Sequence, residues 1–526
     1  MRFIKMSATT LVLLVTSFSG FSQSVEWSEL MKKKGYYPEF FYTGGKNFYS
    51  TVANGALGRT LGIKHYTDFT VDGEDNVEFK VEGKKSRSEG TCLVGDDMVI
   101  FMSQEQNDFQ KLYYQKFDKS CQPTGEPVFF AEYSNEKGSN RYTSFNVFQS
   151  ANRKFICVRY SVPGKKTDTE SFGYKILDES MNVVKDGLFD LPYTNAEAAI
   201  STSFISNSGE YYLGLSIHKT NEKGKVKGNS IADYVIYQMD GNDMKELHLM
   251  ELNTEIFNKG VAELNFAEDS NGLLVFAGLW GTGAATGIEG AFCMKINMDS
   301  KELVSEVFNT FEKDFITATW TDKQKQKAQK REDKGKGSPE FYNYEMRELK
   351  CLPDGSVFVA MEQYFVRVTT YTDSKGNTRT TYHYYYNDVI VYKVGSDNEF
   401  DWVQRIRKFQ HSTNDGGYIL GIGGYLTDNE YVVFFNDNLE NYDESGRYMV
   451  EDSEKLNSTR SSKSKNCVAK AVVNLEIGKL ERTMFTSRAE TDAYCIPKRF
   501  ANDEVNQTLL MYFQTRKKEK FGLLKY

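Results

Sequence analysis

Three acidic side chains have positions from which they could perform chemistry. Glu105, Glu362 and Asp437 each lie near the end of an apolar stretch that is typical of a β-strand. Two carboxylates close together could carry out acid–base catalysis on a glycan. The same groups could instead bind a cation, cap a turn or form salt bridges. The sequence therefore offers these residues as an alternative acidic site, and it assigns no residue a catalytic role.

Clustered aromatic residues are candidates for binding. Residues 382–386 read YHYYY, and the candidates among them are Tyr382, His383, Tyr384 and Tyr385. Such rings can stack on sugars or form a hot spot for a protein partner. The favoured structural interpretation is an extended hairpin in which residues 366–373 and 378–385 flank a turn and the Tyr side chains pair across the strands.

A basic segment supplies further binding candidates. Residues 323–336 read KQKQKAQKREDKGK, which is compatible with a helix and could bind an acidic partner. The favoured alternative is a solvated surface segment, because charged runs usually lie in solvent. The remaining binding candidates are Lys323, Lys330, Arg331 and Trp280, which precedes a glycine-rich stretch.

Motifs for cofactors and metals are missing from the sequence. The five histidines form no paired metal-ligand motif, and the glycines at 281–287 do not match the dinucleotide fingerprint. The oxygen-rich stretch 436–443 lacks the glycine and final glutamate of a calcium loop. We therefore expect no cofactor and no bound metal, and we favour binding over catalysis.

An internal repeat must position these residues. One unit consists of a strand, a tight polar turn and a strongly apolar strand, and a second hairpin follows each of the first six units. The seven copies contain LVGDDMVIFMS, VFQSANRKFICVRY, FISNSGEYYLGLS, NFAEDSNGLLVFAG, LKCLPDGSVFVAM, GYLTDNEYVVFFN and KRFANDEVNQTLLMYF. Four-stranded antiparallel units at this period are typical of a β-propeller. The sequence thus predicts an all-β fold with seven four-stranded blades, with an open stack or two sandwiches as the alternative.

The last unit lacks its final hairpin partner, because the chain ends with FGLLKY. Bare strand edges are avoided in folded proteins, so an N-terminal strand should close the ring. We expect that strand within Asp68–Lys84. The predicted organisation is a signal peptide at 1–22, an N-terminal segment at 23–87 and the propeller at 88–526.

Long insertions are concentrated in units four to six. They comprise residues 281–290, 312–340, 367–387 and 438–466. All four follow the second or the fourth strand of a unit, and in an antiparallel sheet these connections emerge on one face. Loops displayed on one face of a rigid scaffold commonly carry function. This pattern predicts a binding face on units four to six.

The N-terminus has the features of an export signal. Arg2 and Lys5 precede the apolar stretch TTLVLLVTSF, and Gly20 and Ser22 fit a cleavage site before Gln23. The apolar stretch is shorter than the roughly 20 residues of a spanning helix. We therefore expect export to the periplasm or the cell surface, with no transmembrane segment in the mature chain.

The net charge bears on the class of partner, and the cysteine content bears on disulfide bonds. The net charge of −7 disfavours nonspecific binding to nucleic acid. The seven cysteines are odd in number and widely spaced, which favours buried thiols. A Cys92–Cys495 bridge is the alternative.

One stretch of the chain shows a family resemblance. Residues 342–441 contain YNYEMRELKCLPDGSVFVAMEQYFV, YYYNDVIVYKVGSDNEFDWVQRIRKFQ and VVFFNDNLEN, and they resemble exported, uncharacterised β-propeller-like proteins of Bacteroidota. The Phe21–Gln23 processing site is similar to that group's signals. The resemblance implies an exported propeller and brings no activity with it.

Together these observations predict an exported, non-enzymatic binding or scaffolding propeller. Its partner would be a protein or glycan at the cell envelope, bound by the loop face of units four to six. The alternative is a glycan-active hydrolase or lyase with carboxylates near a central pocket. The oligomeric state stays open.

Overall fold

The structure is a computed structural model, and it describes most of the chain after the predicted signal peptide. The described residues are 25–526 without 34–36, 55–59, 107–108, 135–143, 163, 222–224, 253–255, 257–259, 282–286, 319, 335–338, 453 and 460–461. The predicted signal peptide at 1–22 and half of the glycine-rich insertion at 281–290 lie outside them. Within these residues, no helix has both the length and the apolar character needed to cross a bilayer.

Most of the described residues lie in antiparallel β-sheets. Seven sheets have four strands each. In chain order they contain β3 (Glu39–Gly44), β4 (Asn47–Asn54), β5 (Thr60–Thr67), β6 (Thr70–Glu78); β9 (Arg87–Val94), β10 (Asp97–Gln106), β11 (Phe109–Phe117), β12 (Val128–Ser134); β13 (Ser144–Gln149), β14 (Ile156–Ser161), β15 (Thr169–Leu177), β16 (Val183–Thr194); β17 (Ala198–Ile205), β18 (Tyr211–Thr220), β19 (Val226–Asp240), β20 (Asp243–His248); β21 (Val261–Glu268), β22 (Leu274–Trp280), β23 (Gly290–Asn297), β24 (Glu302–Thr310); β25 (Tyr344–Cys351), β26 (Val357–Thr372), β27 (Thr378–Val394), β28 (Phe400–Thr413); and β29 (Gly423–Leu426), β30 (Glu430–Asn438), β31 (Asn466–Asn474), β32 (Leu480–Ser487).

A six-stranded sheet combines the two ends of the described chain. It contains β1 (Val25–Trp27), β2 (Met31–Lys32), β33 (Tyr494–Cys495), β34 (Ala501–Asp503), β35 (Thr508–Gln514) and β36 (Lys518–Lys525). A two-stranded sheet contains β7 (Lys80–Val81) and β8 (Lys84–Lys85). The short helices are α2 (Lys313–Thr317), α3 (Asp322–Glu332), α4 (Arg488–Thr491) and the 3-10 turns η1 (Leu249–Leu252), η2 (Leu439–Asn441) and η3 (Pro497–Arg499).

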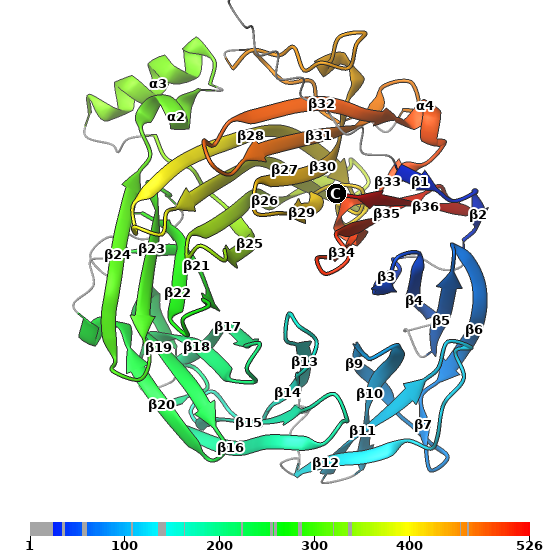
Figure 1. Cartoon of the computed structure of the whole chain (residues 1–526). Helices are drawn as coiled ribbons and strands as arrows, with labels where there is room; N and C mark the ends of the chain where they lie inside the picture. Colours follow the sequence, from blue (N-terminus) through cyan, green and yellow to red (C-terminus); the bar gives the residue numbers. More distant parts are fainter. Residues whose placement is uncertain are drawn as a thin grey trace, which may run out of the picture.

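The sheets follow one another round a ring, and in each four-stranded sheet the first strand lies near the centre and the last at the outside (Figure 1). This is the arrangement of a β-propeller. Apolar clusters fill the space between neighbouring sheets, as where Val275 of β22 packs with Val359 of β26. The cluster containing Phe48 of β4 and Phe521 of β36 joins the first four-stranded sheet to the six-stranded one. Core packing therefore continues round the whole ring.

An N-terminal strand does pair with the C-terminal strand, but it is not the predicted one. In β1, Val25 pairs with Leu524 and Trp27 pairs with Gly522 of β36. The expected closing segment, Asp68–Lys84, instead contributes β6, the polar outer strand of a separate sheet. That sheet, β3 to β6, lies within the predicted N-terminal segment at 23–87. Among the described residues the ring thus contains eight sheets with at least four strands, so the predicted count of seven is not confirmed, and the predicted start at residue 88 leaves out one of these sheets.

All seven cysteines are free thiols, so the alternative Cys92–Cys495 bridge is not formed. Burial raises the pKa of Cys92 to about 12. A thiol at so high a pKa is protonated at neutral pH and is a poor nucleophile. The cysteines thus belong to the apolar packing of the sheets.

Candidate binding site

The predicted basic segment forms a helix in the connection between β24 and β25. Helix α3 begins with a capping box, in which the Thr321 side chain and Gln324 bond to each other's backbone amides. Lys313 of α2 donates to Gln329 of α3 (2.8 Å) and pairs with Glu332. No residue of α3 is buried, because nearly all of its side chains are polar. The helix is therefore fixed at its cap and at Lys313, while its side chains stay free to meet a ligand.

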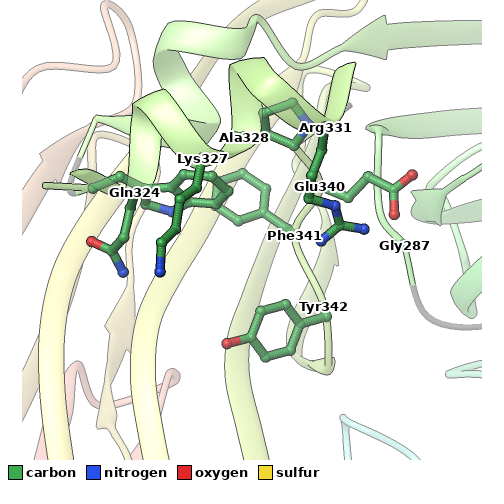
Figure 2. Close-up of a pocket in the computed structure, with 10 residues that line it drawn as sticks. Gly287, Gln324, Lys327, Ala328, Arg331, Glu340, Phe341 and Tyr342 are labelled. Atoms are coloured by element: carbon green, nitrogen blue, oxygen red, sulfur yellow. The ribbon is translucent and has the colours of Figure 1, made fainter. Parts of the chain in front are cut away.

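A pocket of about 480 Å³ lies between α3 and the chain that leads into β25 (Figure 2). It is lined by Gly287, Trp320, Gln324, Lys327, Ala328, Arg331, Pro339, Glu340, Phe341 and Tyr342. Lys327 and Arg331 are four residues apart and therefore project from the same face of the helix. Phe341 is held in place by backbone hydrogen bonds with Ile288 in both directions (2.8 and 3.1 Å). The pocket thus joins an apolar base to a cationic rim.

The polar groups of the pocket favour an anion. Lys327 and Arg331 are exposed, and no side-chain partner is found for either among the described residues. Glu340 is the one carboxylate among the residues that line the pocket, and it lies against Gly287. An arginine without a partner can form two parallel hydrogen bonds with a carboxylate or a sulfate group. The aromatic rings of Trp320 and Tyr342 give the same pocket flat apolar surfaces.

Stacked rings continue from the pocket onto the β26–β27 hairpin; we call them the ring column. Tyr342 contacts Phe365, with ring centroids 5.9 Å apart. Phe365 stacks on Tyr385 at 4.6 Å, and Tyr385 stacks on His411 at 4.6 Å. These stacks follow from the strand register, since Tyr385 is paired with Phe365 on one side and with His411 on the other. The column therefore links the pocket to three adjacent strands.

Two histidines form the far end of the ring column. The His383 and His411 rings lie 5.3 Å apart, and Nδ1 of His383 is 3.1 Å from Nε2 of His411. Nε2 of His383 is 3.0 Å from the Thr369 hydroxyl. Burial, and secondarily the neighbouring His383, lowers the pKa of His411. A hydrogen bond between two imidazoles needs one donor and one acceptor, so the pair holds its geometry only while one facing nitrogen is unprotonated.

The predicted aromatic cluster is divided between two faces of the sheet. The favoured hairpin is present, because β26 and β27 stay paired as far as Thr372 and Thr378. Successive side chains of a strand point to opposite faces. His383 and Tyr385 therefore join the ring column, whereas Tyr382 and Tyr384 lie on the other face, where Tyr384 is close to Gly417. The four residues do not form one platform.

The other predicted binding residues lie in different parts of the structure. Arg331 lines the pocket, but Lys323 and Lys330 do not, although both belong to α3. Trp280 is only 4% exposed, and its indole N–H donates to the carbonyl of Ala291 (3.1 Å). It is a core residue, so its assignment to a binding surface is wrong.

The predicted acidic residues belong to separate sheets and separate networks. Glu362 of β26 is 1% exposed and accepts hydrogen bonds from Lys408 (2.6 Å) and Arg347 (2.9 Å). Asp437 of β30 is also 1% exposed; it accepts from the Tyr442 hydroxyl and is paired with Arg482. Glu105 lies on β10, at the exposed end of another sheet. Glu362 and Asp437 therefore act as buried partners of cations.

Among the described residues, no group of three or more His, Cys, Asp or Glu side chains could hold a metal ion.

Several residues of the site were not predicted. Lys327 could have been found from its spacing to Arg331 on a helix. Phe365 and His411 gave no such signal, because they are brought together only by their register with Tyr385. Tyr342, in the connection before β25, gave none either.

Comparison with known proteins gives similarity of fold at most. No family model and no curated protein matches the chain, so no sequence comparison supports the predicted resemblance to Bacteroidota proteins. Among solved structures, a protein of unknown function from Bacteroides caccae is 9% identical, with a TM-score of 0.27, over 69% of this chain and 94% of that one. The polysaccharide lyase Uly1 is 8% identical, with a TM-score of 0.33, over 95% and 99%. The β-propeller domain of the Trilobed protease from Pyrococcus furiosus is 8% identical, with a TM-score of 0.32, over 71% and 96%. These neighbours include enzymes and a protein of unknown function, and they assign no activity to this chain.

Proposed function

We propose that this protein is an exported binding protein that captures an acidic glycan in the pocket beneath α3 and along the ring column. The observation that carries the proposal is that two cations, Lys327 and Arg331, meet aromatic rings in one pocket and have no side-chain partner among the described residues. Such a site combines an apolar surface with a few polar groups that orient a ligand, as small-molecule sites usually do.

The two kinds of group fit two parts of an acidic sugar. Carboxylate or sulfate groups would pair with Arg331 and Lys327, and such charge-assisted hydrogen bonds are stronger than neutral ones. The flat faces of the sugar rings would lie on Tyr342 and the accessible edges of the ring column, because aromatic side chains offer large apolar area at little entropic cost. A chain of sugars is favoured over a single sugar, since the rings continue from Tyr342 to His383.

Binding is favoured over hydrolysis. Glu362 and Asp437 are each almost fully buried and paired with cations, so a substrate would not reach them. Export rests on the sequence pattern of the N-terminus, and we propose the periplasm or the cell surface as the place where the glycan is met. Fractionation of cells that make the full chain, followed by N-terminal sequencing of the product, tests this location.

The experiment that tests the site is calorimetric titration with a hexamer of galacturonic acid and with a neutral hexamer of glucose. The acidic hexamer should bind, and binding should weaken as salt is added, because the charges are screened. Replacing Lys327 and Arg331 together by alanine should weaken binding about tenfold or more, since two charge-assisted contacts are lost.

A matched control carries the same change of charge on the same helix. The double variant Lys323→Ala and Lys330→Ala should bind as the unchanged protein does, because neither residue lines the pocket. Equal losses in the two double variants would show only a general attraction between helix and anion. No binding of the acidic hexamer, or equal binding of the neutral one, would contradict the proposal.

A further inference from the structure

A second cluster of polar side chains lies on the opposite face of β27, centred on Lys498. The Lys498 amine donates hydrogen bonds to the carbonyl of Gly417 (2.7 Å) and to the Tyr386 hydroxyl (3.1 Å), and it lies 4.4 Å from the centre of the Tyr386 ring. Lys498 belongs to η3, whereas Tyr386 belongs to β27 and Gly417 to the connection between β28 and β29. Three distant segments thus fix the position of one amine.

Two glycines make this arrangement possible. A Cβ atom on Gly417 would lie 2.7 Å from the Tyr386 ring, and one on Gly421 would lie 2.9 Å from Cγ of Lys498. Both glycines also have positive φ angles, +64° and +95°, which other residues rarely adopt. The connection is therefore shaped around the two side chains, and it holds the amine against the phenol.

The surroundings of Lys498 favour its neutral form. Removal of water by the surrounding protein is the largest influence and lowers the pKa of Lys498 to about 8. Glu362 of β26 opposes this shift, whereas Arg347 of β25 and Arg499 of η3 add to it. Asp415, in the connection after β28, opposes it more weakly.

Lys498 differs from the other described lysines whose pKa is lowered. Those are Lys33, Lys408 and Lys470. Lys408 is fully enclosed, and the other two are half-buried, whereas Lys498 is exposed to solvent. Lys498 is thus the one lysine of this set that is exposed at the surface.

We propose that Lys498 is a nucleophile that binds a carbonyl compound covalently, as a Schiff base, with Tyr386 as its proton carrier. At pH 7.5 about a quarter of an amine with a pKa near 8 is unprotonated, against about one in a thousand for an ordinary lysine. Only the unprotonated amine has the lone pair that attacks a carbonyl carbon. This site is independent of the pocket beneath α3.

The reaction needs no oxidant or reductant. The nitrogen lone pair forms the N–C bond while the carbonyl π bond breaks, and the oxygen takes the proton of the Tyr386 hydroxyl. The nitrogen then returns a proton to the Tyr386 oxygen, which gives a neutral carbinolamine. Loss of that hydroxyl group with one further nitrogen proton releases water and leaves the C=N bond. Burial raises the pKa of Tyr386, so the phenol stays protonated between reactions.

Reductive trapping tests the proposal. The full chain is incubated with glyoxylate and sodium cyanoborohydride at a series of pH values, and labelled lysines are quantified by peptide mass spectrometry. At pH 7.5, Lys498 should be labelled about tenfold or more faster than the exposed Lys323, since far more of its amine is unprotonated. Its labelling should rise with pH and level off above about 8.

Two variants and the peptide map distinguish a nucleophile from a purely structural lysine. Tyr386→Phe should slow labelling of Lys498 while its pH profile still levels off near the same value, and Lys498→Arg should abolish labelling in that peptide. The map of the unchanged protein decides the matter even if a variant fails to fold. Labelling of Lys498 no faster than that of Lys323, or unchanged by Tyr386→Phe in a folded protein, would overturn the proposal.

Discussion

The two faces of the β26–β27 hairpin place cations in different environments. On one face, His383 and Tyr385 continue the ring column that leads to Lys327 and Arg331, cations with no partner among the described residues. On the other face, Lys408 of the neighbouring strand β28 is fully buried and paired with Glu362. The strand alternation that separates adjacent side chains produces this contrast.

The two kinds of cation differ in whether they can bind a ligand. A buried cation needs its carboxylate, because an unpaired charge inside a protein is costly. A cation at the surface keeps its hydration and can exchange water for a ligand. The face toward the neighbouring sheet β29–β32 therefore holds a buried ion pair, and the face toward α3 carries the ring column. Lys498 lies between these cases, since it is enclosed by protein and still open to solvent.

The largest expected effect comes from breaking the buried pair. Glu362→Leu leaves Lys408 buried without a carboxylate and should lower the free energy of unfolding by about 3–5 kcal/mol. Urea denaturation followed by fluorescence measures this loss. The double variant Glu362→Leu and Lys408→Met should recover much of it, because an apolar pair replaces the unpaired charge. A loss below about 1 kcal/mol for Glu362→Leu would contradict the assignment of this pair as a stabilising unit.

A smaller effect should distinguish the two faces of the hairpin by their contribution to ligand binding. Tyr385→Ala interrupts the ring column and should weaken binding of the acidic hexamer about two- to tenfold, the value expected for one aromatic contact. Tyr384→Ala, one residue away on the other face, should leave the affinity unchanged. Titration of both variants measures the contrast. Equal losses would mean that the ligand does not follow the ring column.

The smallest expected effect is a dependence of stability on pH. The pKa of His411 is lowered in the folded protein, so this side chain binds fewer protons in the folded state than in the unfolded state. Its contribution to stability should therefore fall as the pH drops from 7 to 5, through the usual histidine value and the lower folded value. Melting temperatures at the two pH values measure the fall, and His411→Asn should reduce it. An unchanged fall in His411→Asn would place its cause elsewhere.

Much of the fold could be predicted from the sequence, because alternating apolar patterns and polar turns recur along the chain. The sheet β3–β6 was missed for a physical reason: its outer strand β6 is mostly exposed and reads as a polar segment, TVDGEDNVE. The closing strand was misplaced as a consequence. Its true position, Val25–Trp27, is only three residues long and carries little pattern.

The site could be predicted only in part. The basic segment and the aromatic hairpin were visible as clusters in the sequence, but whether a residue faces the pocket depends on helix face and strand register. Trp280 shows the limit, because an aromatic residue beside a loop resembles a binding residue until neighbouring strands are seen to cover it. Lys498 gave no signal, since its partners come from segments 81 and 112 residues away.

The sheet shared by β1 and β36 sets an order of events during synthesis. Val25–Trp27 is synthesised before the seven four-stranded sheets, and its partner, Gly522–Leu524, is synthesised after them. Strand β1 therefore lacks its neighbour until all of these sheets have been made. A chaperone would have most to protect during that interval.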